Sequence, residues 1–200
     1  MTTQRLCVWS GPRNVSTALM YSFAQRADTR VVDEPLYAHY LRVTGIEHPD
    51  REAILAAQDQ DGDRVVRELV LGEWDRSLVF FKMMAHHLVQ LDRGFLRQVT
   101  NVLLLRDPRE MLVSLSKVIP QPQLSDTGLP EQAQVFETLS AAGQPPPVLD
   151  SREVLLDPRG VLTELCERIG VGFDEVMLSW RAGPRDEDGV WAPHWYAQVH

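Results

Sequence analysis

The chain has 200 residues, 44% of them hydrophobic, which is enough to bury the core of one globular domain. Its formal net charge of −8 argues against a nucleic acid or an anionic membrane as a partner, because both need clustered Lys and Arg. Cys7 and Cys166 stand far apart in no metal-ligand spacing, and no apolar run reaches the ~18 residues of a membrane span, so we expect a single cytoplasmic domain without a zinc site or disulfide framework.

Five short apolar runs, each bounded by turn or helix-start residues, predict buried strands. Helical patterns lie between them, and the first has apolar or small side chains in an i, i+3, i+4 rhythm from Val15 to Phe23. This alternation predicts an α/β fold, a three-layer α/β/α sandwich around a parallel sheet. The predicted strands are Leu6–Trp9, Arg30–Val32, Leu78–Phe81, Val102–Leu105 and Val148–Leu149.

Several local signals mark where helices begin and end. Asp107-Pro108 and Asp157-Pro158 each supply an N-cap and a Pro at the first helical position, and Gly170 is placed to end the second of these helices. A polar break at Asp59–Asp63 separates two helical segments, whereas Pro120–Pro130 indicates an irregular surface connection.

The stretch between the first strand and the first helix has the layout of an anion-binding loop. Residues 10–12 form a tight turn, Arg13 supplies a cation, and Ser16 and Thr17 add hydroxyl donors where the helix begins. Backbone N–H groups at such a position lack intrahelical partners and lie at the positive end of the helix dipole, which favours phosphate or sulfate. Taken alone, the stretch is equally compatible with an ordinary strand-to-helix turn and a surface Arg.

A second stretch strengthens the prediction of a phosphate site. Arg106 ends the predicted strand 102–105, and Ser114 lies two turns along the helix that Asp107 caps. One guanidinium and one hydroxyl then flank a common point, where phosphate is the natural ligand because Arg offers a charge-assisted fork. Without the first loop, an ion pair between Arg106 and a neighbouring carboxylate would be the simpler explanation.

With both stretches in view, the sequence resembles the sulfotransferases that use 3′-phosphoadenosine-5′-phosphosulfate (PAPS). Gly11-Pro12-Arg13-Asn14-Val15-Ser16-Thr17 is similar to the family's loop for the 5′-phosphosulfate, and Arg106–Ser114 is similar to its 3′-phosphate motif. Residues 148–174 are similar to a late strand and helix of these enzymes, and Gly189–Trp191 to their C-terminal nucleotide-covering loop. The resemblance covers most of the chain. It implies one sulfotransferase-like domain over residues 1–200 with a P-loop NTPase-like fold, in which residues 180–200 form a loop-rich cover that includes Trp191.

The resemblance also implies a role for each motif residue. Arg13 would contact the bridging oxygen of the phosphosulfate, Ser16 and Thr17 the 5′-phosphate, and Arg106 with Ser114 the 3′-phosphate. The implied reaction moves a sulfuryl group from PAPS to a hydroxyl or amine of a small-molecule acceptor. Such a transfer asks mainly for in-line positioning and for neutralising the leaving group, so it needs no metal ion.

The sequence departs from the family's pattern at two places. Asn14-Val15 replaces the usual Ser-Gly, and because β-branched Val15 disfavours a positive φ we expect a wider loop. Met84 stands where the family places its catalytic His, two residues after Lys82.

Four side chains are candidates for the acceptor side of the reaction. His86 is the first choice for the base and His87 the second, because adjacent residues of a helix cannot both face one cleft; a helix-capping or surface role is the alternative for each. Glu34 follows the second strand at the carboxyl edge of the sheet, where it would orient or deprotonate the acceptor, unless it is an ordinary loop carboxylate. Lys82 would approach the sulfuryl oxygens, unless it is only a surface cation at a strand end.

No pattern in the sequence identifies the acceptor or the oligomeric state.

Two other functional classes compete with a sulfotransferase. A P-loop kinase or NTPase needs a Gly-Lys-Ser/Thr ending and a Mg²⁺ carboxylate, and the sequence shows neither. A nucleotide-binding module without turnover stays open because of Val15 and the displaced His.

Overall fold

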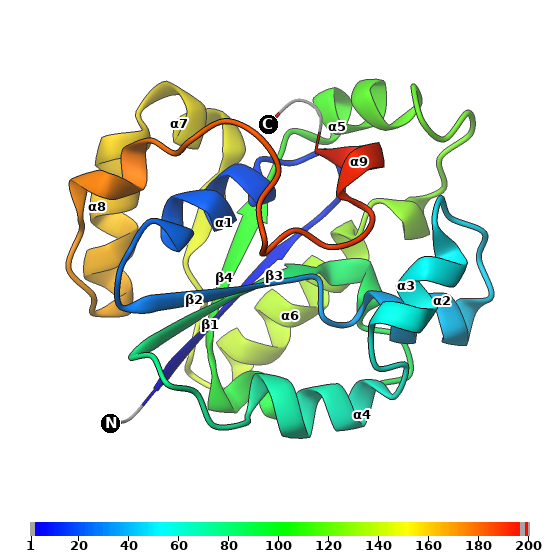
Figure 1. Cartoon of the computed structure of the whole chain (residues 1–200), viewed down its shortest axis with the longest axis horizontal. Helices are drawn as coiled ribbons and strands as arrows, with labels where there is room; N and C mark the ends of the chain where they lie inside the picture. The colour runs from blue at the N-terminus through cyan, green and yellow to red at the C-terminus, as the bar shows by residue number, and fades with distance from the viewer. Residues whose placement is uncertain (1–2, 197–198, 200) are drawn as a thin grey trace.

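The computed structural model describes residues 3–196 and 199, and a five-stranded sheet runs through its centre (Figure 1). The strand order is β2-β3-β1-β4-β5, and all four pairings are parallel. Every predicted strand is present, and the parallel α/β arrangement is confirmed. The strands are β1 (Gln4–Ser10), β2 (Thr29–Asp33), β3 (Leu78–Met84), β4 (Thr100–Leu105) and β5 (Val148–Asp150).

Helices and short turns of helix fill the connections between the strands. The first half of the chain contains α1 (Ser16–Ala24), α2 (Tyr37–Thr44), α3 (Arg51–Ala57), α4 (Gly62–Arg64), the π-helical η1 (Val65–Val70), and the 3₁₀ turns η2 (Ala85–His87) and η3 (Arg93–Gln98). The second half contains α5 (Pro108–Leu115), η4 (Leu124–Asp126), α6 (Leu129–Ala141), α7 (Ser151–Leu156), α8 (Pro158–Ile169), η5 (Glu175–Leu178) and α9 (Ala192–Trp195).

Alternating side chains of the strands build two cores, one on each face of the sheet. Leu6 and Val8 of β1 pack with α1, α8 and η5, whereas Cys7 and Trp9 pack with η1, η3 and α6. This period of two is what a sheet covered on both faces requires. The chain therefore forms the expected three layers, and a third, smaller cluster joins α2 and α3 to the C-terminal segment.

The local helix signals have the expected structural effects. The Asp107 carboxylate accepts a hydrogen bond from the N–H of Arg109 (2.8 Å), and Asp157 caps α8 through the N–H of Gly160 (2.9 Å). Gly170 ends α8 with a left-handed φ of 77°. In the part of the chain that the structure describes, no helix has the length and apolar character needed to cross a bilayer.

Helix α6 is the main element that sequence patterns did not predict. Pro130 was interpreted as part of an irregular connection, but it occupies the first turn of α6, where its missing N–H costs nothing. Gly128 precedes the helix with a φ of 68°. The same two residue types that signal a loop therefore serve here as a helix start.

Helix α6 also contacts the carboxyl ends of β1 and β4, where the chain leaves the two strands in opposite directions. The chain leaves β1 toward β2 on one side and leaves β4 toward β5 on the other, which is the switch point where parallel sheets place their ligands. The buried side-chain amide of Gln132 donates to the carbonyl oxygens of Trp9 (2.9 Å) and Leu104 (3.1 Å). Gln132 thus provides hydrogen-bond donors for two backbone carbonyls at the carboxyl edge of the sheet, where the loop of residues 11–17 begins.

Replacement of Gln132 tests this role. Gln132→Ala leaves the buried Trp9 carbonyl without this donor, so we expect it to lower the free energy of unfolding by about 1–3 kcal/mol in urea titrations. Gln134→Ala is the matched control, because Gln134 lies on the same helix but is exposed. Equal losses in the two variants would contradict the assignment.

Candidate active site

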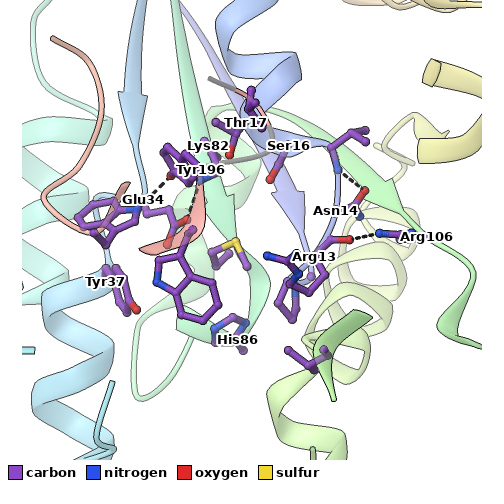
Figure 2. Close-up of a pocket in the computed structure, with 18 of the residues that line it drawn as sticks. Arg13, Asn14, Ser16, Thr17, Glu34, Tyr37, Lys82, His86, Arg106 and Tyr196 are labelled. Carbon is purple, nitrogen blue, oxygen red and sulfur yellow. Dashed lines mark hydrogen bonds and ion pairs between the residues drawn. The ribbon is translucent and has the colours of Figure 1, made fainter. Parts of the chain in front are cut away.

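A cavity of about 630 Å³ opens at the carboxyl edge of the sheet (Figure 2). Its lining comes from two groups of residues. We call one group the loop end, formed by residues 11–18 and Arg106. The other group, the aromatic end, is formed by Glu34, Tyr37, Tyr40, His86, His87 and Trp191.

The loop end combines a strained residue with an open helix terminus. Arg13 has a φ of 56°, a left-handed conformation that is uncommon outside glycine, whereas Val15 has a φ of −88°. The left-handed residue of the loop is therefore Arg13, and Val15 keeps a negative φ. Val15 caps α1 without a side-chain hydrogen bond, and Asn14 fixes the loop by donating to the Leu104 carbonyl (2.9 Å).

Gly11 is required by close packing against another segment. A Cβ atom at this position would lie 2.3 Å from the carbonyl oxygen of Thr127. Because that neighbour is backbone, it cannot rotate away as a side chain could. The first turn of the loop is thus held against the segment that precedes α6.

The structure brings Arg13, Arg106 and Ser114 together, although they are far apart in the sequence. Arg13 Nε donates to Ser114 Oγ (3.1 Å), and Arg106 Nη1 donates to the carbonyl oxygen of Arg13 (2.5 Å; Figure 2). Arg106 also has a carboxylate nearby, with its Nε 3.6 Å from Glu110 Oε2. Arg13 and Arg106 therefore both line the cavity beside the start of α1, and Ser114 is joined to them through its bond with Arg13, an arrangement suited to an anion.

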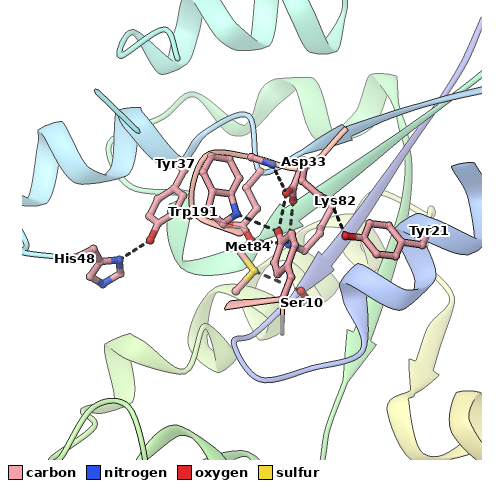
Figure 3. Close-up of polar contacts among 12 residues, drawn as sticks. Ser10, Tyr21, Asp33, Tyr37, His48, Lys82, Met84 and Trp191 are labelled. Atoms are coloured by element: carbon pink, nitrogen blue, oxygen red, sulfur yellow. Dashed lines mark hydrogen bonds and ion pairs between the residues drawn. The ribbon is translucent and has the colours of Figure 1, made fainter. Parts of the chain in front are cut away.

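Lys82 is the centre of a buried ionic cluster rather than a surface cation. Its side chain is 2% exposed, and Nζ donates to Asp33 Oδ1 (2.9 Å), Glu34 Oε1 (2.7 Å) and the hydroxyl of Tyr196 (Figure 3). An ammonium has three protons, so each one has an acceptor. The two carboxylates hold the pKa of Lys82 well above its usual value despite burial.

The C-terminal segment is attached to the same cluster. The Tyr196 hydroxyl donates to Asp33 Oδ2 (2.6 Å) and accepts from Trp191 Nε1 (3.0 Å). The N–H of Gly189 reaches the same Asp33 oxygen (3.2 Å), and Tyr21 binds Asp188 from α1. Trp191, Trp195 and Tyr196 of this segment line the cavity, while Ala197, Gln198 and His200 lie outside the described residues.

His86 and His87 both line the cavity, contrary to the prediction that only one could face it. Ala85–His87 is a single 3₁₀ turn at the end of β3 and not a longer α-helix, and the two rings lie edge to face with centroids 4.6 Å apart, so both reach the cavity. The His87 ring stacks on Tyr37 (centroids 4.9 Å apart) and Tyr40 (4.8 Å). Burial lowers the pKa of His86 from 6.5 to about 3 and that of His87 well below 6.5, so neither is at the surface and neither is a strong base.

Glu34 is strained, buried and next to a cation. It has a φ of 41° and is 8% exposed. Burial raises the pKa of its carboxyl, and the charge of Asp33 adds to that shift, whereas Lys82 opposes it. A carboxylate in this state holds a proton more readily than an exposed one.

Sequence reasoning did not select Tyr37, Tyr40 or His48 as site residues, nor Asp33 and Tyr196 of the Lys82 cluster. Tyr37 and Tyr40 come from α2, and the Tyr37 hydroxyl lies 2.8 Å from His48 Nδ1. Nothing in the local sequence marks them, because their positions follow from packing between α2, η2 and the C-terminal segment. Among the described residues, no group of three or more His, Cys, Asp or Glu side chains is arranged to hold a metal ion.

Comparison with known proteins gives a consistent family match. A family model described as a sulfotransferase domain matches residues 4–200. Two Arabidopsis thaliana proteins, branched-chain-amino-acid aminotransferase-like proteins 1 and 2, are 41% and 38% identical over 193 residues, 96% of this chain. The chain spans only about a third of those relatives, 35% and 34% of their lengths.

Solved structures share the fold at low sequence identity. The sulfotransferase domain of the Synechococcus olefin synthase superposes with a TM-score of 0.59 at 16% identity, covering 92% of this chain and 80% of its own. The sulfotransferase domain from the curacin biosynthetic pathway has a TM-score of 0.58 at 16% identity, covering 96% and 82%. A mouse sulfotransferase complexed with PAP has a TM-score of 0.53 at 8% identity, covering 89% and 62%.

The neutral state of His86 has a consequence for stability. Between pH 6.5 and about 3 the unfolded chain binds a proton at His86 that the folded chain does not, so stability is lost as the pH falls through that window. We expect His86→Gln to flatten the fall of the unfolding free energy by about 1.4 kcal/mol per pH unit, although His48 and His87 still contribute. Urea titrations between pH 6 and 4 measure this slope.

Gln98, an exposed side chain that does not titrate, provides the control for that measurement. Gln98→Ala should leave the pH slope of the wild type unchanged. If His86→Gln gave the wild-type slope as well, the buried neutral imidazole would be refuted.

Proposed function

This chain belongs to the sulfotransferase family, and from that premise we propose that it transfers a sulfuryl group from PAPS to a hydroxyl or amine of a small-molecule acceptor. The family match and the shared fold support the general class of reaction. The donor is proposed from the loop end of the cavity, and the presence of PAP in the mouse structure agrees with it.

The convergence of Arg13, Arg106 and Ser114 is the observation that carries the proposal. In this proposal Arg106 and Ser114 bind the 3′-phosphate of the donor, and residues 11–17 with their open helix terminus bind the 5′-phosphosulfate. Ser16 and Thr17 line the cavity at the first turn of α1, where their hydroxyls add donors. The residues fit such a ligand because cations and hydrogen-bond donors converge there.

In this proposal Arg13 lies beside the S–O bond of the donor, which breaks during the transfer. As sulfur leaves the phosphate, negative charge develops on the bridging oxygen, and a fixed guanidinium beside that atom stabilises the charge. Arg13 is held by Ser114 and by its own carbonyl's bond to Arg106, so it needs little reorganisation. Preorganised charge of this kind acts more strongly in the transition state than on the bound donor.

On the acceptor side, Glu34 replaces His86 as the base we favour. The pKa of Glu34 is raised, whereas the pKa of His86 is lowered to about 3, so the carboxylate is the better proton acceptor of the two. Lys82 holds Glu34 at 2.7 Å and positions it. His86 and His87 remain neutral and contribute hydrogen-bonding and stacking surface to the acceptor.

Titration calorimetry with PAP, adenosine 3′,5′-bisphosphate, tests the donor site directly. We expect PAP to bind and ATP with Mg²⁺ to bind more weakly. Preference for ATP would indicate a kinase or NTPase, and failure to bind either would indicate a repurposed scaffold. PAP binding without transfer to any acceptor would favour a nucleotide-binding module.

Arg106→Ala should weaken PAP binding by about 1.5–3 kcal/mol, the scale of a hydrogen bond to a charged group. Arg109→Ala is the matched control, because Arg109 lies on the same segment with a 90% exposed side chain paired to Asp107. An unchanged affinity in folded Arg106→Ala would remove the 3′-phosphate assignment.

Arg13→Ala should affect turnover more than binding. We expect PAP release from PAPS to slow by about 10²-fold, while the affinity for PAP changes much less. Rapid-quench kinetics beside calorimetry separates the two quantities. A variant that bound PAP poorly but turned over normally would contradict a transition-state role.

A further inference from the structure

The ionic cluster at the aromatic end carries an excess negative charge. Asp33 and Glu34 supply two carboxylates against the single ammonium of Lys82, and all three ammonium protons are already used. Glu34 uses one oxygen for Lys82; its other oxygen, Oε2, has no hydrogen-bond partner among the described residues and is not fully buried, so it is accessible from the cavity that Glu34 lines. A buried, uncompensated charge is costly unless a proton or a cation accompanies it.

The remaining charges of the cavity do not offset this excess. Arg13 and Arg106 belong to the loop end, where the proposed donor binds. Asp126 adds a further carboxylate to the lining, and its charge influences the pKa of Tyr40 and His48. An anionic acceptor would therefore meet like charge, whereas a cationic one would be attracted.

Much of the cavity wall at the aromatic end consists of rings. Tyr37 stacks on His87 and contacts Trp191 edge to face at 5.1 Å, and Tyr40 meets His86 at 5.1 Å. Ring faces and edges suit a planar or apolar skeleton, and they also attract an ammonium group.

We infer that the acceptor is a primary amine on an aromatic or apolar skeleton, and that its ammonium group binds the free oxygen of Glu34. This inference rests on the proposed function, since it specifies the acceptor of the same transfer. The ammonium supplies the charge that the Asp33–Glu34–Lys82 cluster lacks, and the rings hold its skeleton.

The chemistry follows from that position. The ammonium gives one proton to Glu34 and becomes a neutral amine with a lone pair. That lone pair forms the N–S bond while the S–O bond to the donor phosphate breaks, and the bonding electrons go to the phosphate oxygen beside Arg13. The nitrogen loses its second proton to solvent, which leaves a sulfamate and PAP as products.

Three probes with matched skeletons test the acceptor class: 2-phenylethylamine, 2-phenylethanol and 3-phenylpropionate. Ligand-observed NMR titrations are made on the full chain saturated with PAP. We expect the amine to bind about tenfold tighter than the alcohol and the carboxylate to bind most weakly. Equal or tighter binding of the alcohol or the carboxylate would overturn the inference, and this wild-type comparison needs no variant.

Glu34→Gln identifies the group responsible for the preference. The variant should lose the amine preference, whereas Glu167→Gln, an exposed position on α8, should keep it. A preference that survived in folded Glu34→Gln would overturn the assignment of Glu34.

PAP binding in the same samples separates the two levels of the proposal. If PAP binds but the amine preference is absent, the acceptor inference fails and the proposed function stands. If PAP does not bind, the proposed function fails, and the acceptor assignment that rests on it fails as well.

Discussion

The ammonium of Lys82 is the interaction on which the architecture of the site depends. It lies on β3, and its partners come from the end of β2 and from the C-terminal segment, so three distant parts of the chain meet at one nitrogen. Removing an ammonium from water costs several kcal/mol unless oppositely charged and hydrogen-bonding groups replace the water. Asp33, Glu34 and Tyr196 provide that replacement, and in doing so they fix where the last helical turn lies over the sheet.

The two ends of the cavity are built by different means. The loop end depends on strand order, because only the divergence of β1 and β4 leaves space for backbone N–H groups and for Arg106 to face a common point. The aromatic end depends on side chains from α2, η2 and the segment around Trp191. The proposed donor site thus depends on topology, whereas the proposed acceptor site depends on packing.

This difference explains what could be predicted from the sequence. The loop of residues 11–17, the caps at Asp107 and Asp157 and all five strands are local patterns, and each could be recognised within a few residues. The contact of Arg13 with Ser114 could be predicted only because each residue belongs to a motif that is recognisable by itself. Tyr37 and Tyr40 were missed because their partners are distant in sequence, and Pro130 was misjudged because a Pro marks a loop and a helix start equally well.

The loop end of the cavity carries positive charge and the aromatic end carries negative charge, so the cavity is electrostatically polar. The chain as a whole has a net charge of −8, so its general field repels a polyanionic donor, and binding must come from groups close to the phosphates. Arg13 and Arg106 supply that local attraction at one end, while the excess carboxylate beside Lys82 repels the same ligand from the other. In the proposed complex, a donor whose phosphates lie at the loop end has its sulfuryl group on the side of the cavity where Glu34 lies. Because the proposed transfer needs the nucleophile in line behind sulfur, this polarity favours productive orientation before any specific contact with the acceptor forms.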